Sequence, residues 1–178
     1  VSNATLHNED EINRKDIRIG DIAIIERAGD VIPHILSVDI KKRSNNNKKF
    51  VFPKKCPSCG SETIKEFNIL TKKNDAVRRC SSEGYYCEKI SIEKLKHFVS
   101  KEAFNIDGLG KKIIEGFWKL KFIKFPQDIF QLEYDKIEKL EGWGKLSVEN
   151  LKYSINQKKK LSLDRFIYSL GIRHIGLE

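Results

Sequence analysis

Four cysteines lie near one another in the sequence, and their spacing is that of a metal site. Cys56 and Cys59 form a Cys-x-x-Cys pair followed by Gly60, and Cys80 and Cys87 form a second, wider pair. The two thiolates of such a pair can bind one ion, while the glycine lets the backbone turn beneath it. Four thiolates leave no open coordination position, which is typical of a structural zinc. We therefore predict one zinc ion bound by all four cysteines.

Two disulfides, or four buried thiols, are the alternative interpretations of the cysteines. No signal peptide precedes them, and no apolar run is long enough to span a membrane. We therefore expect a cytoplasmic protein without membrane contact, in a reducing compartment where disulfides are uncommon. His97 is the nearest alternative ligand, but the helical pattern around it indicates a packed or solvated side chain.

A search for catalytic groups yields no candidate. The Gly-Leu-Gly-Lys segment at 108–111 lacks the first glycine of a phosphate-binding Walker loop and follows no predicted strand. Asp107 and Asp128 are isolated, which disfavours a carboxylate-bound magnesium centre, and no Ser/His/acid set is visible. We expect this chain to bind rather than to catalyse.

The charge balance favours a polyanionic partner. Lys and Arg number 34 against 25 Asp and Glu, a net charge of +9. Nucleic acid is the commonest partner for such an excess, although a lysine-rich surface that only aids solubility would give the same count.

The hydrophobic pattern divides the chain into a β-rich and a helical part on either side of the cysteines. Residues 1–53 contain apolar runs around the turn at Gly20, over 31–38 and at 50–52, with a polar loop at 41–49. These short strands predict a small β-barrel of the OB-fold type, cut at its N-terminus. Residues 54–90 form the predicted zinc finger, and residues 91–176 form an all-α domain. Its predicted core positions share helical spacing: Ile92, Leu95, Phe98, Val99, Ile113, Ile114, Phe117, Leu120, Val148, Leu151 and Ile155.

A Gly-apolar-Gly repeat recurs in the helical part, and its pattern is that of helix-hairpin-helix units. The residues of the repeats that we predict to bind DNA are Gly108, Gly110, Lys111 and Lys112; Gly142, Gly144 and Lys145; and, in a looser third copy, Gly171, Arg173 and Gly176. The glycines permit close backbone approach, and the following helix presents unpaired N–H groups and its positive dipole end to phosphate. Leu109 and Trp143 would pack between the helices. Two ordinary helical hairpins with glycine caps are the alternative.

These motifs, in this order, resemble bacterial NAD-dependent DNA ligases from end to end. The segments that carry the resemblance are Val-Ser-Asn-Ala-Thr-Leu-His-Asn at 1–8, Asp-Ile-Arg-Ile-Gly-Asp at 16–21, Arg-Ala-Gly-Asp-Val-Ile-Pro at 27–33, the four cysteines, Leu-Lys-His-Phe-Val-Ser at 95–100, and the glycine hairpins at 106–110 and 170–176. The resemblance implies a C-terminal portion of the enzyme, with the adenylation domain before Val1 and further domains after Gly176.

The family seals single-strand nicks in duplex DNA during replication and repair, so the resemblance implies a monomeric binder of nicked duplex. NAD and magnesium would serve the full-length enzyme only, and zinc would join the OB-fold to the helices. Arg27, Val31 and Ile32 would contact DNA from the OB-fold, although one of the two apolar residues could be core. Thr5, His7 and Asn8 are weaker candidates, with a structural role as the alternative.

Two other functions remain open at this point. One is a non-catalytic helix-hairpin-helix and zinc module of a repair protein that binds DNA structures. The other is a zinc-stabilised protein-interaction module whose basic charge only confers solubility. The OB-type motifs before the cysteines favour the ligase over the first, and salt-sensitive binding to nicked duplex would exclude the second.

Overall fold

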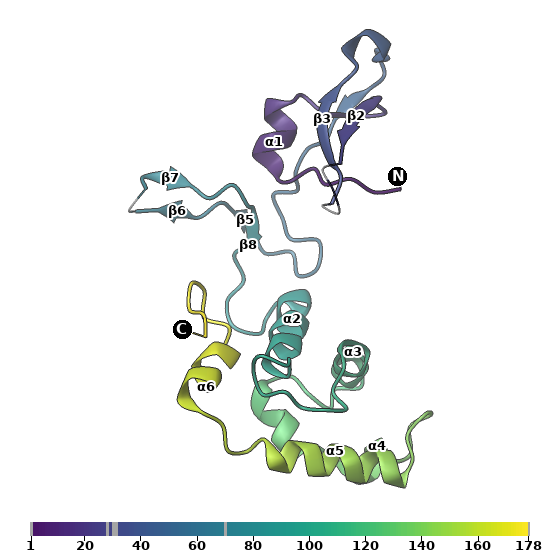
Figure 1. Ribbon diagram of the computed structural model, residues 1–178, viewed down its shortest axis with the longest axis vertical. Coiled ribbons are helices and arrows are strands. Elements are labelled where there is room, and N and C mark those ends of the chain that lie inside the picture. The colour runs from purple at the N-terminus through teal and green to yellow at the C-terminus, as the bar shows by residue number, and fades with distance from the viewer. Residues whose placement is uncertain (1, 28, 30–31, 70, 178) are drawn as a thin grey trace. The chain divides into compact units, whose positions relative to one another are not determined.

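The computed structural model describes residues 2–27, 29, 32–69 and 71–177 of the protein (Figure 1). The chain divides into two compact units, which we call unit 1 (Val1–Ser81) and unit 2 (Ser82–Glu178). The finer division at residues 53 and 90 stays a prediction.

The first part of unit 1 holds two separate antiparallel strand pairs. β1 (Arg18–Ile19) pairs with β4 (Lys48–Lys49), and β2 (Ala23–Glu26) pairs with β3 (His34–Val38). The turn between β1 and β2 contains Gly20, whose φ of +93° suits glycine. The apolar runs predicted the strands on either side of this turn and the strand ending at Val38, although β1 and β2 do not pair with each other. The strand pairs do not show a closed barrel, which stays a prediction.

A short helix interrupts the N-terminal stretch that was predicted to be β structure. α1 (Glu9–Arg14) begins after Asn8, whose side-chain Oδ1 accepts a hydrogen bond from the Glu11 backbone N–H at 3.0 Å. Three acidic residues fill the first turn of α1 and complement the helix dipole. The β prediction for these residues is therefore wrong, because the local capping signal outweighs the surrounding β pattern.

The predicted strand at 50–52 is also wrong. β4 ends at Lys49, and the three residues after it lie outside any strand. Phe50 and Phe52 instead contact each other edge to face, with ring centroids 4.9 Å apart, while Val51 is 78% exposed. The preceding polar loop begins with a 3₁₀ turn, η1 (Ile40–Lys42), before it reaches β4.

The second part of unit 1 is an interrupted β-hairpin beside the first cysteine pair. β5 (Thr63–Ile64) pairs with β8 (Arg79–Cys80), and β6 (Phe67–Asn68) pairs with β7 (Lys73–Asn74). The Arg78 guanidinium next to β8 donates to the Glu9 carboxylate of α1 at 2.9 and 3.0 Å. No described aliphatic or aromatic residue of unit 1 is fully buried, so ion pairs such as this one help to hold its elements together.

The regular elements of unit 2 are all helical within its described residues, as predicted for this part of the chain. Its elements are α2 (Glu88–Phe98), α3 (Lys111–Lys119), η2 (Pro126–Gln131), α4 (Tyr134–Ile137), α5 (Lys145–Gln157) and α6 (Leu163–Ser169). α2 packs against α3, and α4 and η2 pack against α5.

The helical core confirms most of the predicted apolar faces. The predicted positions that are fully buried are Ile92, Leu95, Phe98, Val99, Ile114, Phe117, Val148, Leu151 and Ile155. The prediction that Leu120 is a core residue is wrong, because 49% of this residue is exposed. It follows the last residue of α3 as the C-cap, and therefore falls off the helical face that its spacing implied.

Shortening Leu151 should destabilise unit 2 strongly. The side chain is 1% exposed and lies within the central core cluster. We expect Leu151→Ala to lower the free energy of unfolding by about 2–5 kcal/mol through lost burial and a cavity. Urea titration followed by tryptophan fluorescence measures this unit, because Trp118 and Trp143 both belong to it. Leu163→Ala, at a site 71% exposed, should change stability by about 0.5 kcal/mol or less; equal losses in both variants would contradict the assignment of the core.

Candidate metal centre and nucleic-acid interface

The four cysteine sulfurs converge on one point. The Sγ atoms of Cys56, Cys59, Cys80 and Cys87 all lie within 4.8 Å of one another. The Sγ atoms of Cys59 and Cys80 are 3.5 Å apart, well beyond the ~2.05 Å of a disulfide bond. Sulfurs at about 2.3 Å from a tetrahedral zinc would be about 3.8 Å apart, so the spacing fits a metal-bound set. The cluster is compatible with one metal ion.

Local backbone structure positions each of these thiols. The Gly60 N–H donates to the Cys56 carbonyl at 2.9 Å, and Gly60 adopts a φ of +76°, so the first pair sits on the predicted glycine turn. Cys80 ends β8, opposite Thr63 of β5. Cys87 is the N-cap residue of α2 and is 1% exposed. The thiols therefore come from a turn, a strand and a helix start.

His97, the alternative ligand, contacts another group. One of its ring nitrogens lies 2.7 Å from the backbone carbonyl oxygen of Tyr168, and the two rings are 4.7 Å apart. The metal-compatible cluster of the described residues consists of cysteines and does not include His97. Of the two settings expected for His97, packed or solvated, the half-buried ring against Tyr168 corresponds to the packed one.

The first two glycine hairpins have the local geometry that the repeat predicts. Gly108 and Gly142 adopt φ values of +88° and +78°, which are unfavourable for residues with a side chain. Gly110 and Gly144 are the N-cap residues of α3 and α5. Each hairpin thus leads directly into the start of an amphipathic helix.

The apolar residues between the glycines pack inward, as expected. Leu109 is 3% exposed and belongs to the core of unit 2. Trp143 is half-buried against the same core, with its ring 5.5 Å from that of Phe117.

The starts of α3 and α5 differ in charge from those of the other helices. α1, α2, α4 and α6 each have an acidic residue in the first turn, whereas the described first turns of α3 and α5 have none. They carry the exposed side chains of Lys111, Lys112 and Lys145 instead. A glycine N-cap has no side chain to accept from the first N–H groups, which therefore stay available to an external acceptor.

The two hairpins share one groove of about 390 Å³. Gly108 and Gly142 both line it, together with Asp107, Trp143, Ser147 and Asn150. Ser147 and Asn150 were not among the predicted site residues. The sequence carried only a weak signal for these two residues. Both are polar and lie beside the buried residues Val148 and Leu151 of α5, as many surface residues do.

The third copy of the repeat has a different setting. Gly171 follows α6 with a φ of +63°, and a Cβ there would come within 3.4 Å of the His97 ring on α2. Arg173 and Gly176 are exposed, and no helix follows Gly171 within the described residues, which stop at Leu177. This hairpin therefore lies against α2 and does not line the groove of the other two.

The candidate DNA-contacting residues of unit 1 fall at the end of β2 and just before β3. Arg27 directly follows β2 and is exposed, and Ile32 is 71% exposed, so Ile32 is not a core residue. Val31 lies outside the described residues. Asn8 caps α1, and the Thr5 N–H donates to the Pro33 carbonyl at 2.7 Å, so both have the structural role given as the alternative.

Among the described residues, no helix combines the length and the apolar character that a membrane span requires.

Known proteins match the chain over its whole length. A family model described as the NAD-dependent DNA ligase OB-fold domain matches residues 1–47. A DNA ligase of Pelagibacter ubique (strain HTCC1062) is 72% identical over 178 residues, covering 100% of this chain and 26% of the relative. DNA ligases of Xanthobacter autotrophicus and Beijerinckia indica are 47% and 50% identical, each over 99% of this chain. The chain thus spans about a quarter of the length of these relatives. Over its whole length the chain is similar to bacterial DNA ligases, and its first 47 residues match the OB-fold domain of the NAD-dependent ones.

Proposed function

We propose that this chain is the DNA-binding portion of an NAD-dependent DNA ligase that seals single-strand nicks in duplex DNA. It would act as a monomer in the bacterial cytoplasm, during replication and repair, and grip the duplex around the nick. The adenylation chemistry, with its NAD and magnesium, would belong to the rest of the enzyme. The chain is similar to bacterial DNA ligases over its full length, and this similarity supports the proposal.

The lysine-bearing starts of α3 and α5 carry the proposal. A cation at a helix N-terminus opposes the helix dipole, and each such placement is unfavourable by a few tenths of a kcal/mol. The same arrangement places lysine, free N–H groups and the positive dipole end around one anion. α3 and α5 both have lysine and no acidic residue in the first turn, whereas α1, α2, α4 and α6 each have an acidic residue there. Phosphate binding at these two helix starts explains why lysine occurs there.

The common groove adds the second half of the argument. A duplex offers two phosphate backbones, and two hairpins that line one groove could each bind one of them. Backbone amides and lysines read phosphate rather than bases, so binding should be independent of sequence. Arg27 and Ile32 would add contacts to phosphate and sugar from unit 1. Arg173, beside the third hairpin, is an additional candidate.

The cysteine cluster would hold zinc as a structural ion. Four thiolates select zinc or iron over magnesium and calcium, and a closed tetrahedral sulfur set is typical of structural zinc. The ion would stabilise the turn around Gly60 and the end of β8, without taking part in ligation.

Binding to a nicked duplex tests the proposal. We expect the 178-residue chain to bind a fluorescent nicked duplex, with affinity falling steeply between 50 and 200 mM KCl, a range in which six to ten phosphate contacts would lose about 10³–10⁵-fold. In Lys111→Gln/Lys145→Gln, the slope of log K against log salt should become shallower by about two, one per lost phosphate contact.

A matched control removes equal charge elsewhere in unit 2. Lys159 and Lys160 are exposed and follow the C-terminal end of α5, at the opposite end from Lys145. We expect Lys159→Gln/Lys160→Gln to bind nearly as the unmodified chain does. Equal effects of the two pairs would mean that net charge alone drives binding, and would contradict the hairpin assignment.

A further inference from the structure

A lysine-rich loop in unit 1 is fixed more firmly than its polar sequence suggests. Residues 40–49, which we call the lysine loop, contain four lysines, one arginine and no acidic residue. The four lysines are exposed, whereas the Arg43 side chain is only 12% exposed. The single arginine thus points into unit 1 while the lysines face solvent.

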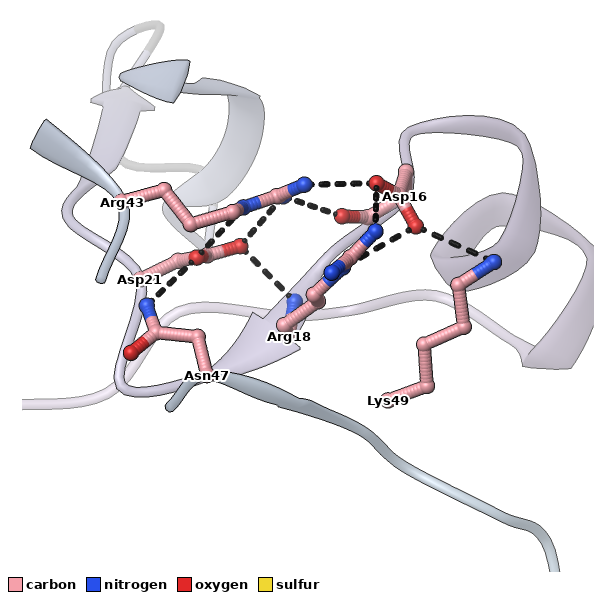
Figure 2. Close-up of polar contacts among 6 residues, drawn as sticks. All are labelled: Asp16, Arg18, Asp21, Arg43, Asn47 and Lys49. Atoms are coloured by element: carbon pink, nitrogen blue, oxygen red, sulfur yellow. Dashed lines mark hydrogen bonds and ion pairs between the residues drawn. The ribbon is translucent and has the colours of Figure 1, made fainter. Parts of the chain in front are cut away.

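Arg43 ties the loop to Asp16 and Asp21, which lie on either side of β1 (Figure 2). Its Nε and Nη2 donate to the two carboxylate oxygens of Asp21 at 2.9 and 2.7 Å. Its Nη1 donates to the Asp16 carboxylate, and Nη2 to the Asp16 backbone carbonyl, both at 2.6 Å. The planar guanidinium therefore bridges two aspartates more than twenty residues away in sequence, a geometry for which arginine is suited and lysine is not.

Further contacts close this cluster around Asp21, whose side chain is 3% exposed. Its carboxylate also accepts from the Arg18 backbone N–H at 2.8 Å and from the Asn47 side-chain Nδ2 at 2.9 Å (Figure 2). The hydrogen bonds from Arg43, first among these contacts, hold the pKa of Asp21 well below its usual range. The aspartate therefore stays ionised and anchors both ends of the lysine loop at neutral pH.

The lysines of the loop differ in their partners. Lys42 lies 3.5 Å from the Asp39 carboxylate, and Lys49 lies 3.4 Å from that of Asp16. In the described part of the chain, Lys41 and Lys48 have no acidic partner within 4.0 Å. These two charges are available to an external anion.

We propose that Arg43 is a positioning residue that holds the lysine loop so that Lys41 and Lys48 bind the phosphate backbone of duplex DNA. The inference rests on the proposed DNA-binding function and adds a contact surface to it. Ordering a free loop on binding would cost about 1–2 kcal/mol per fixed residue. A loop already held by Arg43 avoids most of this loss, so its lysines can contribute net affinity.

The lysine pair provides the first test, because exposed Lys→Gln changes should leave the fold intact. We expect Lys41→Gln/Lys48→Gln to weaken binding of the nicked duplex about tenfold at 150 mM KCl and to make the salt slope shallower by about two. Lys159→Gln/Lys160→Gln again serves as the control for charge. An unchanged slope in the lysine-loop pair would overturn the inference.

Arg43→Lys provides the second test, because it keeps the charge but cannot bridge both aspartates. We expect it to weaken binding about as much as the lysine pair, and to cause no further loss when combined with that pair. Binding equal to that of the unmodified chain, or fully additive losses, would refute the positioning role. If Lys111→Gln/Lys145→Gln still weakens binding while the loop variants do not, only the loop inference fails. If the unmodified chain shows no salt-dependent binding, both the proposed function and the loop inference fail.

Discussion

Chelation of the metal is expected to unfold the cysteine-bearing part of unit 1 while unit 2 keeps its fold. Unit 1 has no fully buried aliphatic or aromatic residue among those described, so it lacks an apolar core that could hold the Cys56–Gly60 turn and the β5–β8 hairpin without the ion. Structural zinc contributes about 10–16 kcal/mol of apparent binding energy in small zinc modules, and this energy is folding energy. Unit 2 has an extensive helical core of its own.

Three measurements check this result on the same chain. Metal analysis should return one zinc per chain before chelation. After chelation, amide hydrogen exchange over residues 56–80 should accelerate strongly. Tryptophan fluorescence should stay unchanged, since both tryptophans belong to unit 2.

A single ligand change separates the metal from other effects of the chelator. Cys59→Ser should weaken zinc binding by more than about 100-fold, because changes outside the ligand shell alone cost about 10–100-fold. Ser58→Ala, at the adjacent exposed position, should retain the metal. A chain with no metal and two disulfides would contradict the zinc assignment and restore the alternative interpretation of the cysteines.

The helical faces of unit 2 could be predicted from the sequence because each helix buries one stripe within its own unit. Leu95 and Phe98 on α2, and Leu151 and Ile155 on α5, are buried at the spacing that the period implies. The spacing of apolar residues does not indicate where a helix ends. Leu120 was therefore predicted to lie on the buried face of α3, although α3 ends one residue earlier.

The errors in unit 1 have a different physical origin. A strand needs a hydrogen-bonding partner, and the apolar character of residues 50–52 does not provide one. The start of α1 was detectable, since Asn8 followed by three acidic residues is a helix-capping signal. The pairing of Arg43 with Asp16 and Asp21 was not detectable, because periodicity carries no information about which distant charges meet.

In the candidate site, too, local features could be predicted from the sequence, and features that depend on packing could not. The spacing of the cysteines and of the hairpin glycines is local, and it led directly to the thiol cluster and to the positive φ values of Gly108 and Gly142. That both hairpins line one groove depends on how α3 and α5 pack, and this required the structure.

Replacing the first glycine of each hairpin is expected to weaken duplex binding without regard to base sequence. A valine at Gly108 or Gly142 would have to adopt a left-handed conformation, which is unfavourable by about 1–2 kcal/mol. At Gly108 the new Cβ would also approach the Leu151 side chain to 3.4 Å. Relief of this strain would move the N–H groups at the start of α3 or α5 away from the phosphate.

The loss should be about tenfold or more for each hairpin. A hydrogen bond to a charged group contributes about 1.5–3 kcal/mol, and each 1.4 kcal/mol is a factor of ten in affinity. Fluorescence polarisation with two nicked duplexes, one rich in A·T and one in G·C, measures both the loss and its independence of sequence.

Two other glycines of unit 2 separate strain from binding. Gly84 has a φ of +57° and open space around its Cβ position, as Gly142 has, but it does not belong to a hairpin. Gly84→Val should therefore lower stability as Gly142→Val does, yet leave affinity for DNA unchanged. Gly116→Ala, inside α3 with nothing within 4 Å, should stabilise unit 2 by about 0.5–1 kcal/mol. If Gly84→Val and Gly142→Val weakened binding equally, the effect would be one of stability, and the hairpins would not be the sites that hold the phosphates.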